Sequence, residues 1–357
     1  MRLYEGSFNL VVKDTAREMR EVCGGIKFYF PNIIKELASE SELPYKVVYL
    51  DQKCWIDIAR MYYHKQTERE SELVGKILEA SEKYEVIFPL SISHLEETMK
   101  ISSARRKNEL VPLMVRLSRG YSFQPYFSIN IRTEIQNIVL RKLGLPQINV
   151  RNLILKQGIS NLIGGGKPTL VSRKGSELPE DIKRELLDLL ESPKTLEFSF
   201  KLKLPKSFLN MNEIEIFEKN RQELSKIKDN DMRQRAFLAW NMRAIIVPEL
   251  AKTLYECVLP KDFILKEKST RKDIEGLLDS IPTALCLLTL IYQRDQQLQR
   301  PIQANDFHDI WFLTLALPYS DIVVTEKMWA SIARQTKLDR KCNTKILSSI
   351  KELGKYL

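Results

Sequence analysis

Residues 305–327 constrain the fold most, because an apolar helix is followed there directly by a short apolar strand. The helix is predicted to begin at Asn305, a good N-cap residue, to continue through the almost wholly apolar residues 310–317, and to end at Pro318. Residues 322–325, with the sequence IVVT, are then predicted to form a buried strand. A buried helix next to a buried strand is typical of an α/β domain.

Four acidic residues lie at the ends of this helix and strand, and their positions indicate a metal site. Asp306 and Asp309 are three residues apart in the expected helix, so their carboxylates share one helical face. Asp321 opens the expected strand, and Glu326 follows its C-terminal end, the edge at which open α/β sheets bind ligands. Because clustered carboxylates repel one another unless a cation is present, the pattern predicts a bound divalent metal ion.

Two upstream stretches repeat the order of a strand followed by acidic residues and a helix. Residues 47–50 are predicted to form a strand, Asp51 follows them directly, and a helix is expected to begin shortly afterwards. Residues 84–90 form the next expected strand, and the helix after it carries His94 and Glu97 on one face. Each motif is short, so the specific signal is their order along the chain and their placement at strand ends.

In this order and placement the motifs resemble those of PIN-like nucleases, the fold of PilT N-terminal domains and of many toxin ribonucleases. The family has an Asp after its first strand, an acid in an early helix, an Asp opening a later helix and an acid after the following strand. The matching residues here are Asp51, Glu97, Asp306 and Glu326. Glu326 departs from the family, in which Asp is more common at that position, and Asp309 and Asp321 are further acids that could take its metal-binding role.

The resemblance covers roughly residues 45–110 and 300–340, and it implies an α/β fold. The expected fold is a PIN-like core with a parallel sheet flanked by helices, interrupted by a large, mostly α-helical insertion. Glu97 and Asp306 are 209 residues apart, more chain than a compact PIN domain needs between them. Residues 1–45 are predicted to form an N-terminal extension. Residues 46–110 and 296–357 are predicted to form a split nuclease core, and residues 111–295 a basic helical insertion within it.

The positive charge of the chain is concentrated in one stretch. Residues 100–174 contain fourteen Lys or Arg and two acids, an excess of twelve that is larger than the net charge of +10 of the whole chain. A localised basic surface is typical of a protein that binds a polyanion. The side chains predicted to contact nucleic acid are the basic residues just beyond Glu97 and the two histidines next to the acids: Lys100, Arg105, Arg106, Lys107, His94 and His308.

Each of these residues also has a simpler interpretation. Asp51 and Asp306 could merely cap or charge the start of a helix, and Glu97 could be a solvated helix residue. Asp321 could be a turn residue, and the two histidines could be ordinary core or capping residues. The basic stretch could be a solvated surface, although its near absence of acids argues against this. The acids together favour a site, because all of them come from strand ends or helix starts in the family's order.

These observations lead to the hypothesis of a metal-dependent endonuclease that uses Mg²⁺ or Mn²⁺. The resemblance implies that Asp51, Glu97, Asp306 and Glu326 bind the metal, and that RNA is the more expected substrate than DNA. The alternative is a non-catalytic nucleic-acid-binding or assembly protein with a degenerate PIN-like core, which Glu326 favours. A third interpretation, a purely helical interaction protein, requires the three expected strands to be wrong.

Localisation and partners follow from composition and from the family. No apolar window approaches 18 residues, and the N-terminal sequence is interrupted by charge, so neither a membrane span nor a signal peptide is expected. The five cysteines have no paired metal spacing and are predicted to be reduced, as in a cytoplasmic protein. The expected partners are nucleic acid, an inhibitory protein of the kind that restrains toxin or antiviral defence nucleases, and a second copy of the chain in a homo-oligomer.

Overall fold

The computed structural model describes residues 43–64, 67–164, 179–200, 211–265 and 269–357. The predicted N-terminal extension, with an expected strand at 26–30 and helix at 31–38, therefore lies almost wholly outside the described residues. Most of the glycine-rich turn predicted at 164–168 and the end of the linker expected at 192–210 also lie outside them.

A four-stranded parallel sheet with the order β2-β1-β5-β6 forms the centre of the fold. Its strands are β1 (Lys46–Leu50), β2 (Val86–Ile87), β5 (Ile322–Val324) and β6 (Lys345–Leu347). The prediction that the strands at 47–50, 84–90 and 322–325 lie in one parallel sheet is confirmed. The middle one is shorter than predicted, because Pro89 has no N–H to donate, and beyond it only Leu90 forms an isolated bridge with Ser122.

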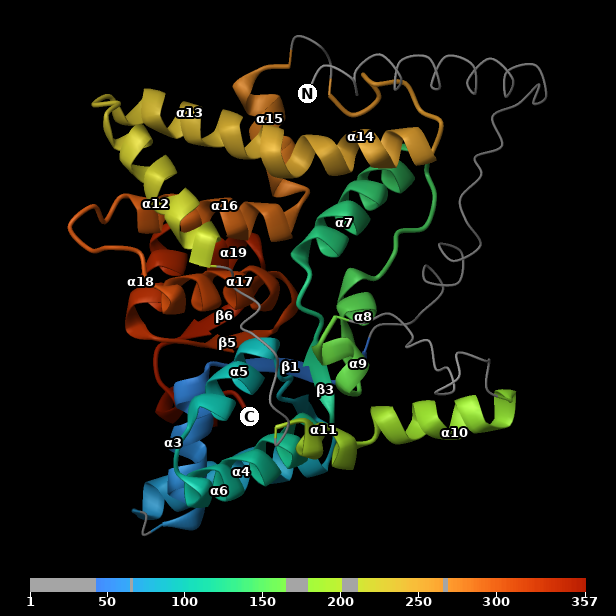
Figure 1. Cartoon of the computed structure of the whole chain (residues 1–357), viewed down its shortest axis with the longest axis vertical. Helices are drawn as coiled ribbons and strands as arrows, with labels where there is room; N and C mark the ends of the chain where they lie inside the picture. The colour runs from blue at the N-terminus through green and yellow to red at the C-terminus, as the bar shows by residue number, and fades with distance from the viewer. Residues whose placement is uncertain (1–42, 65–66, 165–178, 201–210, 266–268) are drawn as a thin grey trace.

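Helices from the first part of the chain cover one side of this sheet. Figure 1 shows α3, α4 and α6 below the strands. The helices are α3 (Gln52–Tyr63), α4 (Glu68–Glu82), α5 (Ile92–Lys100) and α6 (Ala104–Ser118). The first two confirm the helices predicted at about 54–64 and 67–82. A capping box between Thr67 and Glu70 begins α4, which satisfies backbone N–H groups that have no partner inside the helix.

Helices from the last part of the chain cover the other side, above the strands in Figure 1. They are α16 (Pro282–Asp295), α17 (Ala304–Tyr319), α18 (Lys327–Gln335) and α19 (Leu338–Lys341). The 3-10 helix η2 (Ile350–Lys355) follows β6 and packs instead against α3 and α4 on the first side. The predicted burial of α17 is confirmed, since almost all of its side chains are inside the protein. Its end was predicted too early, because Pro318 is accommodated inside the final turn.

The middle of the chain is mostly helical, as predicted for residues 111–295. It contains α7 (Phe127–Lys142), α8 (Val150–Ile154), α9 (Ile159–Leu162), α10 (Glu180–Glu191), α11 (Pro193–Ser199), α12 (Met211–Ser225), α13 (Asn230–Asn241), the π-helix η1 (Met242–Ile246), α14 (Val247–Glu256) and α15 (Arg271–Asp279). A short antiparallel pair, β3 (Tyr121–Phe123) and β4 (Leu155–Gln157), lies among them.

The strongly apolar residues 274–292 predict a single helix, but the structure has two helices, α15 and α16, that meet at an angle of 112°. Pro282 explains the break, because it occupies the first turn of α16, where its missing N–H costs nothing. Within the described ranges no single helix is long and apolar enough to cross a membrane, and this bent pair alone has the length and composition of a broken span.

The apolar core is continuous between the sheet and the intervening helices. A buried carboxylate reinforces this packing, because Glu134 of α7 accepts hydrogen bonds from the backbone N–H and the hydroxyl of Thr283 in α16 and from the hydroxyl of Tyr319 in α17. Burial raises the pKa of Glu134 to about 7. The middle helices therefore pack through α7 on α16 and α17, which cover the sheet, and the division of the chain into a split core and an insertion stays a prediction.

Candidate functional site

The C-terminal edge of the parallel sheet brings Asp51 and Glu326 together. Asp51 follows β1 and Glu326 follows β5, and these two strands are hydrogen-bonded neighbours with Leu50 opposite Val324. The backbone N–H of Asp51 donates to the carbonyl oxygen of Val324 at 3.0 Å, which holds the two strand ends in register. Both acids are also N-caps, Asp51 of α3 and Glu326 of α18, so the chain turns sharply at each of them.

The Asp51 side chain is held firmly. Its Oδ1 accepts a hydrogen bond of 3.0 Å from the backbone N–H of Cys54 in the first turn of α3. Capping was the simpler interpretation of this residue, and the structure confirms that Asp51 does cap the helix. Capping uses only Oδ1, and Oδ2 of Asp51 can still face the other acids. Helix capping and metal binding by Asp51 are therefore compatible.

Glu97 and Asp309 join this edge from two helices on different parts of the chain. Glu97 lies in α5 and is partly buried. Asp309 lies in the second turn of α17, and its Oδ2 accepts a hydrogen bond of 2.8 Å from the indole Nε1 of Trp329 in α18. Trp329 is fully buried, so it gives Asp309 a fixed orientation.

The four carboxylates act electrostatically on one another, as expected for side chains that face the same edge of the sheet. The pKa of Glu97 is raised to about 7, mainly by burial and also by the negative charges of Asp51 and Glu326, against the opposing effect of Lys100. Burial also raises the pKa of Asp309 to about 7, with contributions from Glu97, Glu326 and Asp51. The pKa of Asp51 is raised by burial and by Glu326. Asp51, Glu97, Asp309 and Glu326 are called the carboxylate cluster below.

The donor chemistry of the carboxylate cluster suits a hard divalent cation. Carboxylate oxygens are the ligands that Mg²⁺ and Mn²⁺ prefer, and mutual repulsion among four of them is relieved by a cation. Among the described residues none of the four forms an ion pair within 4 Å. The same part of the chain contains no group of three or more His, Cys, Asp or Glu side chains already gathered around one point, so a bound ion would have to draw the carboxylates closer.

Asp306, predicted as a metal ligand, is held in a different place. Its side chain is 2% exposed and forms ion pairs with Arg294 at 2.8 Å and with Arg300 at 2.9 Å. It also accepts a hydrogen bond of 2.9 Å from the backbone N–H of Gln303, which begins α17. The sequence placed Asp306 and Asp309 on one helical face, but only Asp309 reaches the carboxylate cluster, because the two arginines turn Asp306 toward the connector between α16 and α17.

Asp321 lies at the opposite edge of the sheet from the carboxylate cluster. It precedes β5, and its Oδ2 accepts hydrogen bonds from the backbone N–H of Val47 at 2.7 Å and from Arg151 at 2.6 Å. The three-residue strand β5 separates this end from the Glu326 end by about 10 Å. Asp321 therefore joins the start of two strands to α8, and it is outside the cluster.

Neither histidine near the acids lies on a surface that nucleic acid could reach. His94 is fully buried, and its Nε2 lies 2.8 Å from the carbonyl oxygen of Leu50. Burial lowers the pKa of His94 to about 3, so the ring is neutral. His308 is 6% exposed and lies 3.4 Å from Oε2 of Glu96, and burial lowers its pKa despite this neighbour. The core interpretation of both histidines fits better than a phosphate-binding role.

No family model, curated protein or solved structure matches this chain. The resemblance to PIN-like nucleases therefore depends on the residues of this chain and on their arrangement.

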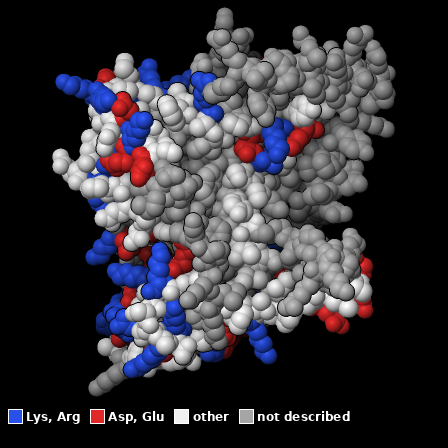
Figure 2. All heavy atoms as spheres, viewed as in Figure 1, with Lys and Arg blue, Asp and Glu red and all other residues white. Residues whose placement is uncertain are grey.

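The four basic side chains predicted to contact nucleic acid differ in their partners and in their link to the carboxylate cluster. Lys100 ends α5, is exposed, and acts electrostatically on Glu97. Arg105 forms an ion pair of 2.9 Å with Glu109, Lys107 donates to the carbonyl oxygen of Met99 at 2.9 Å, and Arg106 is exposed. Figure 2 shows acidic side chains recessed at the level of α5, with Lys and Arg side chains beside and below them. Of the predicted set, Lys100 is thus the cation most directly linked to the carboxylate cluster.

Several residues that matter for the site were not identified from the sequence. Trp329, which orients Asp309, belongs to an amphipathic helix and has no sequence signal of its own. Arg294 and Arg300 lie in a polar stretch at 293–304, for which the sequence predicts only a connector into the helix that begins near Asn305. Their signal was present, because an acid in the first turn of an almost wholly apolar helix requires a cationic partner once it is buried.

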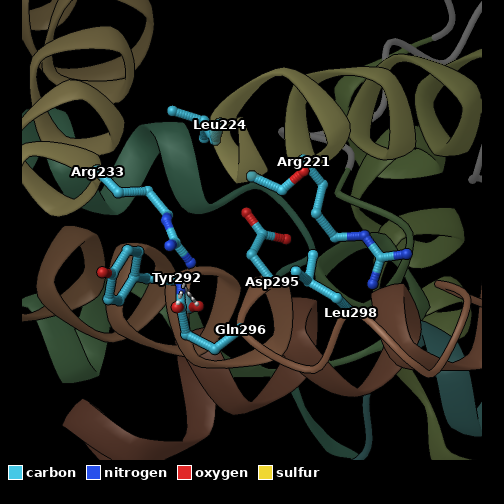
Figure 3. A pocket seen from close by; sticks show the side chains of 8 residues that line it. Arg221, Leu224, Arg233, Tyr292, Asp295, Gln296 and Leu298 are labelled. Atoms are coloured by element: carbon cyan, nitrogen blue, oxygen red, sulfur yellow. Dashed lines mark hydrogen bonds between the residues drawn. The ribbon is translucent and has the colours of Figure 1, made fainter. Parts of the chain in front are cut away.

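A small pocket lies between α12, α13 and α16, away from the carboxylate cluster (Figure 3). Its lining includes Arg221, Arg233 and Asp295. Burial raises the pKa of Asp295 to about 7, and its Oδ1 has no hydrogen-bond partner among the described residues. None of the four clustered carboxylates lines this pocket, so it is a separate feature of the helical region.

Proposed function

We propose that this chain is a PIN-like, metal-dependent endonuclease, with RNA as the more expected substrate. The observation that carries the proposal is the carboxylate cluster. Four acids from two strand ends and two helices face the C-terminal edge of a parallel sheet and act electrostatically on one another, and none of them has a paired cationic side chain among the described residues. A protein keeps such repulsion where a cation or a charged substrate compensates it.

In the proposed mechanism Asp51, Glu97, Asp309 and Glu326 hold Mg²⁺ or Mn²⁺. When bound, the ion supplies a water of lowered pKa and stabilises negative charge on the leaving oxygen. The residues of the chain give the site its geometry. Asp51 is fixed by the N–H of Cys54, and Asp309 is fixed by the indole of Trp329. The exposed ammonium group of Lys100 binds the phosphate backbone next to Glu97.

The choice of RNA over DNA comes from the family analogy, because no residue pattern discriminates between them. The same analogy supports a toxin or defence role under the control of an inhibitory protein, and self-association as a homo-oligomer. A cytoplasmic location is supported by the cysteines, since the four that the structure describes, Cys54, Cys257, Cys286 and Cys342, are free thiols.

A second candidate is a nucleic-acid-binding protein whose PIN-like core no longer cleaves. Two observations favour it. Glu326 stands where the family has Asp more often, and its longer side chain is exposed. The cluster also lacks a preassembled group of three ligands within the described residues.

Cleavage of labelled single-stranded RNA and DNA with Mg²⁺, Mn²⁺ or EDTA separates the two candidates. We expect cleavage that EDTA stops, and we expect Asp51→Asn and Asp309→Asn each to abolish it while nucleic-acid binding remains. Asp57→Asn is the matched control, because Asp57 lies in the same helix as the Asp51 cap but pairs with Arg60 on the outside. Folded Asp51→Asn protein that cleaves at the wild-type rate would refute the proposal, and binding without any cleavage would favour the second candidate.

A further inference from the structure

The connector between α16 and α17 contains an arginine, Arg300, that is both firmly held and open to solvent. We propose that Arg300 binds a backbone phosphate of the nucleic acid next to the carboxylate cluster, on the α17 and α18 side of the site. This inference depends on the proposed function, because it names a substrate contact of the same site. The sequence analysis did not include Arg300 among the phosphate-binding residues.

The backbone of Arg300 is fixed by two other arginines. Its carbonyl oxygen accepts hydrogen bonds from Nη1 of Arg221 at 3.0 Å and from Nη1 of Arg294 at 3.1 Å. Arg221 reaches across from α12, and Figure 3 shows its guanidinium directed toward the chain around Leu298. Arg221 and Arg294 are almost fully buried, at 4% and 0% exposure, so the connector is attached to the body of the protein rather than free to move.

The side chain of Arg300 is oriented by Asp306. Its Nη2 donates to Oδ1 of Asp306 at 2.9 Å, while Arg294 occupies the other carboxylate oxygen at 2.8 Å. One carboxylate between two guanidinium groups leaves one positive charge uncompensated. The buried Arg294 cannot present that charge to a ligand, but the Arg300 side chain is 45% exposed. The excess charge is therefore presented to solvent through Arg300.

Two of its contacts place this guanidinium against the two helices, α17 and α18, that carry Asp309 and Glu326 near their N-terminal ends. Along α17, Asp306 is three residues before Asp309, which is about 5–6 Å between neighbouring side chains on a helix. Across to α18, Nη1 of Arg300 lies 2.8 Å from Sδ of Met328. Met328 belongs to the first turn of α18, the helix that has Glu326 as its N-cap and whose Trp329 binds Asp309.

A purely structural role for Arg300 explains these contacts less well. Asp306 already has a buried partner in Arg294 and a backbone donor in Gln303, so its charge is compensated without a second arginine. A half-exposed ion pair of this kind contributes little to stability. A preoriented guanidinium at the edge of a metal site is instead the group that binds phosphate oxygens through paired hydrogen bonds. Together with Lys100 on α5, it would hold the strand from both sides of the cluster.

The test measures binding, separately from cleavage. Arg300→Met is made in the Asp51→Asn background, and the affinity for a labelled single-stranded RNA is measured by fluorescence anisotropy at increasing NaCl. We expect the Kd to rise by about tenfold at low salt, the size of a lost hydrogen bond to a charged group. We also expect the slope of log K against log salt to become shallower by about 0.7, the value for one phosphate contact in a single strand.

Arg271→Met is the matched control. Arg271 is 49% exposed and pairs with Asp231, a carboxylate that also pairs with a second arginine, Arg235. It lies in α15, near the top of Figure 1 and separated from α5 by α16, α17 and the sheet, so both the Kd and the slope should stay unchanged. Arg300→Lys keeps the positive charge but loses the paired N–H donors of the planar guanidinium. It should retain the slope of log K against log salt while binding RNA more weakly than the parent.

The outcomes separate this inference from the proposed function. If the Asp51→Asn parent binds no RNA and no DNA, the proposed function fails, and this contact fails with it. If the parent binds and Arg300→Met leaves both Kd and slope unchanged, the contact is wrong while the nuclease proposal stands. Urea unfolding of each variant confirms that it is folded, and Arg300→Lys decides the matter should Arg300→Met fail to fold.

Discussion

Replacing Asp306 and Asp309 separately by Asn should change the stability of the protein in opposite directions. The two residues are one helical turn apart and chemically identical, but their surroundings differ. Asp306 neutralises Arg294, which is fully buried, whereas Asp309 adds negative charge to the carboxylate cluster. The same conservative change therefore removes an attraction at one position and a repulsion at the other.

Asp306→Asn leaves the buried guanidinium of Arg294 without a counter-ion. Breaking a buried ion pair from one side costs about 3–5 kcal/mol. We expect the lower end, about 3 kcal/mol, because Arg294 also donates to the carbonyl oxygens of Arg300 and Pro301, which Asn does not disturb. For a chain of this size an m-value of about 3 kcal/mol/M converts this loss into a fall of about 1 M in the urea midpoint.

Asp309→Asn should have the reverse effect in EDTA, and only at higher pH. The pKa of Asp309 rises from 3.8 in the unfolded chain to about 7 in the fold, so ionisation costs stability as the pH increases from about 4 to 7. The full rise corresponds to at most about 4 kcal/mol, and solvent near this half-buried site reduces the gain from the variant to about 1–2 kcal/mol at pH 8. At pH 4 the two proteins should unfold alike. The Asn side chain can still accept the hydrogen bond from Trp329.

Urea unfolding at pH 4 and pH 8 in EDTA, followed by circular dichroism, measures both effects. The reasoning is refuted if Asp306→Asn is as stable as the parent, or if Asp309→Asn loses stability at pH 8. A stable Asp306→Asn protein that also fails to bind Mn²⁺ would return Asp306 to the metal site that the sequence predicted.

Two further predictions concern residues outside the cluster. Asp321→Asn should leave the cleavage rate unchanged, because Asp321 lies at the opposite sheet edge, and a large loss of cleavage in the folded variant would contradict that position. The substitution should lower stability by about 1 kcal/mol, because the ion pair of Asp321 with Arg151 is partly exposed. Glu134→Gln should flatten the dependence of stability on pH between about 4.5 and 7. In the wild-type protein the pKa of Glu134 is raised to about 7, so ionisation of this carboxyl lowers the stability of the fold across that window. Identical pH profiles of urea unfolding for the two proteins would show that Glu134 does not ionise in this window.

The strands and their pairing could be predicted because they depend on local patterns. Residues 47–50 and 322–325 are β-branched and apolar runs followed by acids, and parallel pairing brings their C-terminal ends to one edge. Asp51 and Glu326 were therefore placed correctly relative to each other. The strand β6 was not predicted, because Lys345–Leu347 is too short for its pattern to stand out from the surrounding helices.

The assignment of Asp306 could not be made from the sequence, because it depends on side chains that approach from other elements. Helical spacing predicts that Asp306 and Asp309 share a face, but it does not predict which partner each one meets. Arg294 and Arg300 meet the first and Trp329 meets the second, and these contacts decide which carboxylate belongs to the cluster. The sequence could not decide between a core role and a phosphate-binding role for the two histidines for the same reason, since proximity in sequence to an acid does not reveal burial.

The pairing of β1 with both an early and a late strand has a consequence for the synthesis of this protein. β2 is available to β1 soon after it is made, but β5 and the acids Asp309 and Glu326 emerge from the ribosome more than 200 residues after Glu97. At translation rates of 5–20 residues per second, this delay is roughly 10–45 s. Throughout that interval the nascent chain has one unpaired edge on its central strand and only two of the four carboxylates. A chain interrupted before β5 would therefore be prone to aggregate and unable to assemble the site, so any activity would begin only when synthesis is nearly complete.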